Sequence, residues 1–169
     1  VAAELPGHGW AVITYELPWR VAGRTVGPRP PASDPAWRCG VEAVRATWPG
    51  VPLVTGGRSA GARIACRTWD ADLAGVVALS FPLHPPGKPA QSRLGELAPV
   101  GVPVLLVSGA RDPFGSPAEL EQALAGPQAG PRELVVIAGA THSFPRPAGA
   151  RVAAAVAEFV GRLAADRSV

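Results

Sequence analysis

The chain has 169 residues, of which 47% are hydrophobic and 17% are charged, and its formal net charge is +3. This composition excludes a disordered chain, and no apolar run reaches the roughly 20 residues that a membrane-spanning helix needs. The 16 Lys and Arg residues are scattered along the chain, so the pattern argues against both a nucleic-acid-binding surface and a membrane partner. The length suits one domain with a buried core, and we expect a single domain over residues 1–169.

Cysteine usage and the N-terminal sequence bear on cofactors and location. Cys39 and Cys66 are too few for a disulfide framework and have no metal-ligand spacing, so we expect no metal and no cofactor, with both thiols buried as small apolar groups. The first residues lack a basic start followed by an apolar run and a small-residue cleavage site. We therefore expect a cytoplasmic protein.

The first third of the chain predicts few regular elements. Residues 1–8 indicate the end of a helix, and residues 10–15 are typical of a strand. Residues 16–35 contain five prolines and are expected to form a loop that borders an active site. Asp34 is expected to cap a helix that ends at Trp48.

The rest of the chain alternates short apolar runs with helical patterns. We expect further strands over residues 52–55, 75–80, 102–108 and 133–137. Helices are expected over residues 60–68, 116–125 and 148–165, the second of them capped by Ser116. This alternation predicts an α/β fold in which helices cover both faces of a mostly parallel sheet of about five to six strands. In such sheets ligands bind beyond the carboxyl ends of the strands.

A serine flanked by glycines follows the strand at residues 52–55. Gly57, Ser59 and Gly61 form the pattern G-x-S-x-G, which is typical of a serine held on a strained strand-to-helix turn with its hydroxyl exposed. We expect glycine at both flanking positions because a side chain there would strike the neighbouring strand or helix. The next helix directs its first N–H groups at the serine, so the Ala60 N–H is a candidate oxyanion donor.

A serine hydroxyl becomes an effective nucleophile when a base takes its proton, and histidine suits that task near neutral pH. His8 lies in a presumed surface turn, and His84 lies in a proline-rich loop where it serves the structure or contacts substrate. His142 follows the last strand in a loop of small and polar residues, where no packing requirement explains an imidazole. We therefore favour His142 as the base for Ser59.

An acid is required to orient such a histidine. Asp112 follows an apolar strand and is the candidate, although a turn aspartate beside Pro113 is an equally good interpretation of this residue alone. Asp34, Asp70 and Asp72 fit helix-capping or exposed helix-end positions better. The chain order serine, aspartate, histidine, each after a separate strand, favours Asp112 as the acid.

These residues lie in segments that resemble the α/β-hydrolase superfamily, and especially its small dienelactone-hydrolase-like bacterial branch. The segments are ELPWRVAGR, GGRSAGAR, ALSFPLHPPGKP, SGARDPFG and GATHSF. The resemblance implies that Ser59 is the nucleophile, His142 the general base and Asp112 its orienting acid. Dienelactone hydrolase itself has cysteine at the nucleophile position, so its substrate is not implied here. Relatives begin with further strands and a histidine-glycine loop that donates a second oxyanion N–H, so the resemblance implies an N-terminally short chain.

The expected function is hydrolysis of a small ester or thioester through an acyl-enzyme on Ser59, as in a carboxylesterase or thioesterase. Arg58 and His84 are candidate substrate contacts, and an anionic acyl group would suit Arg58, although exposed arginine is common. The partner is then a small-molecule substrate. The alternative is a non-catalytic protein of the same fold that acts as a binding or interaction module.

Overall fold

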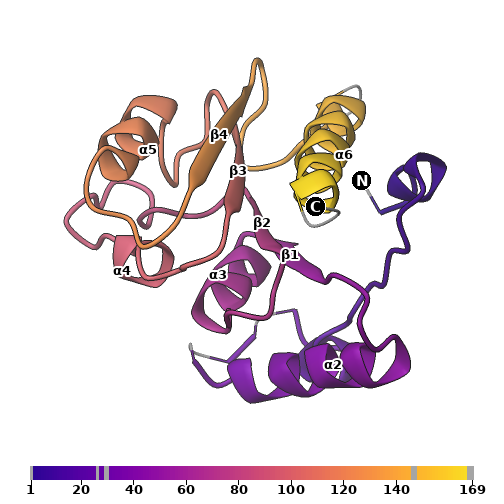
Figure 1. Ribbon diagram of the computed structural model, residues 1–169. Helices are drawn as coiled ribbons and strands as arrows, with labels where there is room; N and C mark the ends of the chain where they lie inside the picture. The colour runs from indigo at the N-terminus through magenta and orange to yellow at the C-terminus, as the bar shows by residue number, and fades with distance from the viewer. Residues whose placement is uncertain (1, 26, 29–30, 146–147, 167–169) are drawn as a thin grey trace.

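The centre of the structure is a parallel β-sheet (Figure 1). The computed structural model describes residues 2–25, 27–28, 31–145 and 148–166. The strands are β1 (Val54–Arg58), β2 (Gly75–Leu79), β3 (Val104–Gly109) and β4 (Arg132–Ile137). They lie in the order β1-β2-β3-β4, and each pairs in parallel with the next. The α/β class is confirmed, while the sheet of the described residues has four strands instead of the expected five to six.

Helices separate the strands along the chain. They are η1 (Leu5–His8, a 3-10 helix), α1 (Pro18–Val21), α2 (Asp34–Thr47), α3 (Ala60–Arg67), α4 (Leu94–Leu97), α5 (Pro117–Leu124) and α6 (Ala148–Asp166). The predicted cap of α5 is confirmed, because the Ser116 side chain accepts the Glu119 N–H and the Glu119 carboxylate accepts the Ser116 N–H. The short helices α1 and α4 were not predicted by the sequence pattern.

The two faces of the sheet carry separate hydrophobic cores. Alternate residues of a strand point to opposite faces, and Leu106 of β3 lies in one core while Leu105 lies in the other. Buried residues of α3, α4 and α5 complete the first core, and buried residues of α6 complete the second. Figure 1 shows α6 on one side of the sheet and α3 to α5 on the other. Both faces are thus covered, as expected for a parallel sheet.

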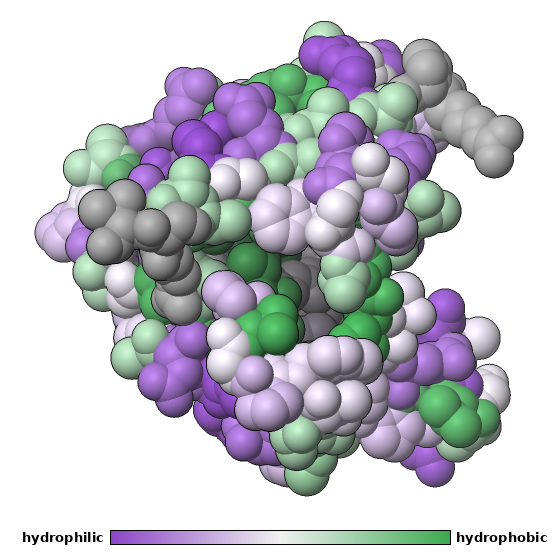
Figure 2. Space-filling view, turned by 45° about the vertical axis from the view of Figure 1, so that its right-hand side comes forward, coloured by the Kyte–Doolittle hydropathy of each residue, from purple (hydrophilic) through white to green (hydrophobic). Residues whose placement is uncertain are grey.

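The predicted strand at residues 10–15 is wrong. These residues have no strand assignment, and in Figure 1 the N-terminal segment runs apart from the sheet, toward α2. Tyr15 explains its course, since the Tyr15 hydroxyl donates to the Ala36 carbonyl at 2.9 Å and its ring meets Trp37 edge to face. Figure 2 turns this side forward and shows a hollowed face with hydrophobic side chains in green along the hollow. Tyr15 thus holds the end of this run against α2, while Ile13 stays exposed.

The predicted capping role of Asp34 is also wrong. Its side chain caps no helix N–H; its two oxygens accept hydrogen bonds from Arg67 at 2.6 and 2.9 Å. Arg67 also contacts Glu96 at 3.2 Å, and Glu96 accepts a further bond from Arg63 at 2.7 Å. These largely buried ion pairs link α2, α3 and α4, because the long arginines of α3 reach a carboxylate on each neighbour.

The two thiols differ in environment. Cys66 is buried in the first core, and this burial raises the pKa of its thiol to about 12. Cys39 is exposed on α2, so the expectation of two buried thiols is wrong for this residue. The helix α2 lies at the periphery and presents much of its surface to solvent (Figure 1).

None of the helices described has the length and apolar character required to cross a membrane.

Candidate active site

Ser59 occupies the turn between β1 and α3. β1 ends at Arg58, α3 begins at Ala60, and Ser59 itself has φ 55° and ψ −111°. Such a conformation costs a non-glycine residue about 1–3 kcal/mol. The Ser59 N–H donates to the Leu79 carbonyl at 2.9 Å, so pairing with the end of β2 helps to hold the turn. The result is a serine that projects from the carboxyl end of the sheet.

The two glycines around Ser59 have different roles. A side chain at Gly57 would place its Cβ 2.6 Å from the backbone of Gly61, so this position requires glycine. A Cβ at Gly61 would meet no atom within 4 Å, so the expectation that both glycines avoid a clash is wrong for Gly61. The turn therefore excludes a side chain at Gly57, at the end of β1, and has room for one at Gly61, at the start of α3.

Three side chains from three strand ends meet in one hydrogen-bonded chain. His142 Nε2 lies 2.8 Å from Ser59 Oγ, and His142 Nδ1 lies 3.0 and 2.9 Å from the two carboxylate oxygens of Asp112. A carboxylate accepts only, so Nδ1 carries the ring proton and donates it to Asp112. Nε2 is then an acceptor for the Ser59 hydroxyl. The sequence had singled out these three residues, and the structure brings them together.

The loop after β4 reaches the loop after β3 because of one glycine. A Cβ at Gly109 would lie 2.1 Å from the Thr141 carbonyl, so only glycine allows this approach. Arg111 then joins the two loops: its N–H donates to the Ala140 carbonyl at 2.9 Å and its guanidinium donates to Gly139 at 2.7 Å. These bonds place His142 beside Asp112. No role was predicted for Gly109 or Arg111 from the sequence.

The acid is shielded, whereas the histidine and the serine are partly exposed. The Asp112 side chain is 1% exposed, the His142 side chain is 24% exposed, and Ser59 is partly buried. A buried carboxylate requires hydrogen-bonding partners, and Asp112 accepts bonds from His142 and from the Phe114 N–H, the latter at 2.9 Å. Solvent therefore has access to Ser59 and His142, while the carboxylate stays shielded.

Phe114 is the other residue that the sequence analysis missed. Its ring centroid lies 4.2 Å from that of His142, with an interplanar angle of 34°. The available signal was an aromatic residue two positions after the candidate acid, in the segment DPF.

The alpha/beta hydrolase domain family model matches residues 1–164. The chain belongs to the α/β-hydrolase family. Among curated proteins, the comparison found no match.

Solved structures share the α/β-hydrolase fold with this chain. An esterase from Pyrococcus furiosus has a TM-score of 0.67 at 18% identity, over 82% of this chain and 64% of that chain. An α/β serine hydrolase homologue from Coxiella burnetii has a TM-score of 0.59 at 20% identity, with the same two coverages. Est1E from Butyrivibrio proteoclasticus, solved with ferulic acid bound, has a TM-score of 0.62 at 17% identity, over 79% of this chain and 68% of that chain. This α/β-hydrolase chain thus matches about two-thirds of the length of these proteins.

The remaining candidate residues lie at or beyond the rim of the site. Arg58 and Ala60 flank Ser59 and are exposed. His84 is 6% exposed and faces α5, with Nδ1 2.9 Å from the Pro85 carbonyl and Nε2 3.1 Å from Glu119. Hydrogen bonds from Ser116 and then from His84 lower the pKa of Glu119. Both ring nitrogens of His84 are therefore bonded to protein atoms, and the structure does not join it to the hydrogen-bonded chain of Ser59.

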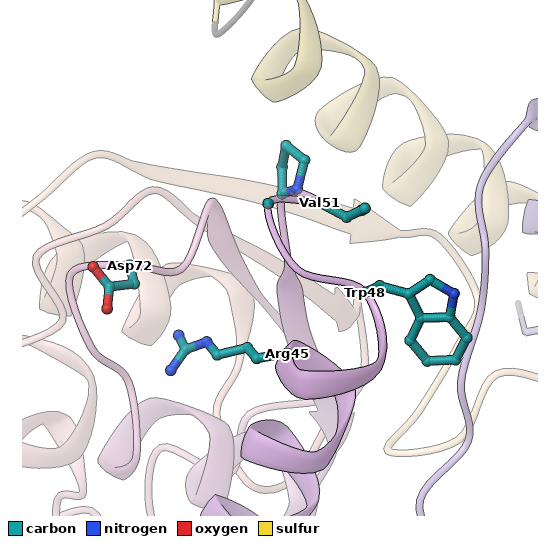
Figure 3. Close-up of a pocket in the computed structure, with 6 residues that line it drawn as sticks. Arg45, Trp48, Val51 and Asp72 are labelled. Carbon is teal, nitrogen blue, oxygen red and sulfur yellow. The ribbon is translucent and has the colours of Figure 1, made fainter.

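A hollow of about 320 Å³ lies at the other end of β1. Its lining residues are Arg45, Trp48, Gly50, Val51, Pro52 and Asp72. Figure 3 shows Trp48 directed away from Arg45 and Asp72, so the wall is divided into an apolar and a charged part. These residues lie before or beside the start of β1, whereas Ser59 follows its end. Within the described part of the chain, no group of three or more His, Cys, Asp or Glu side chains is placed to hold a metal ion.

Proposed function

We propose that this chain is a serine hydrolase that cleaves small esters or thioesters. The observation that supports this most directly is the hydrogen-bonded chain from Asp112 through His142 to Ser59. It combines a strained, accessible hydroxyl with a base whose other nitrogen is held by a buried carboxylate. Membership of the α/β-hydrolase family supports the same reaction class.

In the proposed reaction, Ser59 Oγ forms a bond to the acyl carbon while His142 Nε2 takes the hydroxyl proton. The tetrahedral intermediate then breaks its bond to the leaving alcohol or thiol, which receives that proton from Nε2. Water, deprotonated in turn by His142, then adds to the acyl carbon of the acyl-enzyme. The second tetrahedral intermediate breaks its bond to Ser59 Oγ, which takes the proton back from Nε2, and the acid leaves. Asp112 keeps the proton on Nδ1 and stabilises the imidazolium that forms in each half-reaction.

The start of α3 is the proposed oxyanion site. Ala60 is the first residue of this helix, and the first N–H groups of a helix have no intrahelical acceptor. We assign the Ala60 N–H as one donor to the developing oxyanion, assisted by the positive end of the helix dipole.

A fluorophosphonate probe tests the nucleophile. The wild-type chain is expected to be labelled, Ser59→Ala is expected not to be, and Ser92→Ala, which changes an exposed serine elsewhere, should react like wild type. The labelling rate should fall in acid because a protonated His142 cannot accept the serine proton. Labelling of Ser59→Ala would contradict the assignment. No labelling of the wild-type chain would favour the non-catalytic binding protein instead.

The exposed Arg58 suggests which acyl groups the site accepts. It precedes Ser59 directly and is charged at every relevant pH, so we propose that it attracts an anionic acyl chain. Arg58→Gln should then lower kcat/KM for a succinate or glutarate half-ester by about two- to fivefold and leave a neutral ester of equal length nearly unchanged. Equal effects on both esters would remove this role from Arg58.

A further inference from the structure

Phe114 contacts both Asp112 and His142, the two residues that are hydrogen-bonded in series to Ser59. Its backbone N–H donates to Asp112 Oδ1 at 2.9 Å, and its ring lies on the imidazole of His142 with centroids 4.2 Å apart. The two contacts come from one residue of one turn. The position of the carboxylate and the plane of the imidazole are therefore set by the same piece of backbone.

The turn that carries Phe114 is held from several sides. The Asp112 N–H donates to Gly109 at 3.1 Å, which closes the turn after β3. The Phe114 carbonyl accepts the His84 N–H at 3.0 Å, and the His84 ring contacts Glu119 at the start of α5. The ring of Phe114 is half-buried. Its position is thus held by contacts to β3, His84 and α5, in addition to the bonds by which Arg111 joins this turn to the loop of His142.

The loop of His142 is held by the turn after β3. The Arg111 N–H donates to the Ala140 carbonyl, and the Arg111 guanidinium donates to the Gly139 carbonyl. The His142 side chain is 24% exposed. The ring of Phe114 closes one face of the imidazole and leaves its edge free to reach Ser59 and Asp112.

The stacked ring also acts on charge. The face of a benzene ring carries negative potential and attracts a cation placed over it. When His142 takes the proton of Ser59, the imidazolium is held at its edge by Asp112 and on its face by Phe114. The neutral imidazole gains less from the ring, so the contact favours the protonated form that the reaction passes through.

We propose that Phe114 is a positioning residue, which fixes the ring plane of His142 and stabilises its protonated form during acyl transfer. The inference rests on the proposed function for its catalytic part. The contact between the rings of Phe114 and His142 does not depend on the proposed function, and the NMR titration tests it without any reaction.

The test compares Phe114→Leu, Phe114→Tyr and Phe144→Leu. Leucine keeps an apolar side chain and removes the aromatic face, tyrosine keeps the face, and Phe144 is a partly buried phenylalanine two residues after His142 that packs on the α6 side of the sheet. Circular dichroism confirms that each variant is folded. The measurements are the fluorophosphonate labelling rate of Ser59 from about pH 5 to 8 and the NMR titration of the His142 imidazole over the same range.

Phe114→Leu is expected to slow labelling by about tenfold and to move the acid limb and the NMR midpoint of His142 toward acid. Phe114→Tyr should restore both values, and Phe144→Leu should leave both unchanged. If Phe114→Leu matches wild type in both measurements, or if Phe144→Leu has the same effect, the proposal is wrong. If the wild-type chain is not labelled at all, the proposed function fails, and the NMR midpoints still decide whether Phe114 stabilises the His142 cation.

Discussion

His142 Nδ1 lies at nearly equal distances, 3.0 and 2.9 Å, from the two carboxylate oxygens of Asp112. Both oxygens thus face one N–H, and whichever accepts it, the ring keeps its proton on Nδ1 and its lone pair on Nε2. This arrangement fixes the tautomer that can act as a base toward Ser59.

Replacing Asp112 by Asn should therefore cost more activity than the loss of one charge suggests. The amide can present its NH₂ group to Nδ1, which favours the tautomer with the proton on Nε2 and removes the acceptor for Ser59. We expect ester hydrolysis to fall by about a thousandfold or more, with the fold retained. Asp72→Asn, at an exposed position in the turn before β2, is the control and should keep full activity. An Asp112→Asn variant with near wild-type rates would exclude this acid.

The ion pair between Asp34 and Arg67 should contribute to stability. Its side chains are only 13% and 15% exposed, and removing the Asp34 carboxylate leaves the largely buried Arg67 guanidinium with the more distant Glu96 carboxylate, at 3.2 Å, to pair with. We expect Asp34→Asn to lower the free energy of unfolding in urea by about 2–4 kcal/mol. Glu158→Gln removes a partner of a well-exposed pair on α6 and should cost less than about 1 kcal/mol. Similar losses for both variants would contradict this difference in burial.

The two cysteines should react very differently with iodoacetamide at pH 8. Cys66 is buried and its thiol pKa is raised to about 12, so it stays protonated and inaccessible, whereas Cys39 is exposed. The native chain should take up one equivalent, and the urea-unfolded chain two. Mass spectrometry of Cys39→Ala supplies the control, since rapid modification of this variant in its native state would show that Cys66 is accessible.

Asp70 should make part of the stability depend on pH. Its hydrogen bond from Arg45, 2.7 Å long, lowers the pKa of the carboxyl in the folded chain below the pKa in the unfolded chain. The stabilisation is therefore fully present at a pH above the unfolded-state pKa. It is lost as the pH falls through the folded-state pKa. The side chain is 36% exposed, so the effect at pH 7 is less than about 1 kcal/mol. Urea unfolding of Asp70→Asn should show a small loss at pH 7 that disappears in acid. An equal loss of unfolding free energy at pH 7 and in acid would show that the effect of Asp70→Asn does not come from ionisation of the carboxyl.

Much of the fold could be predicted because buried parallel strands are short apolar runs. Those before residues 59, 80, 110 and 138 are all strands in the structure, and their ends differ from the prediction by a few residues at most. The run at residues 10–15 has the same local character but no strand beside it, and a strand exists only with a neighbour to pair with. That neighbour is not encoded in the run itself.

The candidate site divides in the same way. Ser59, Asp112 and His142 could be selected because each follows a strand, and the carboxyl ends of parallel strands meet at one edge. The contact of Phe114 with His142 depends on how two loops cross, and the pairing of Asp34 with Arg67 depends on how two helices approach. Contacts between loops or helices that are distant in the sequence depend on tertiary packing, and no local sequence pattern predicts them.

The order of the strands gives the site an uneven resistance to local opening. Within the described residues β1 and β4, which lead to Ser59 and His142, are the outer strands, whereas β3, which leads to Asp112, has a strand on each side. Outer strands open to solvent through smaller fluctuations than central strands. As denaturant is added, Ser59 and His142 should therefore move apart while the core around β3 is still intact, and activity should be lost before secondary structure.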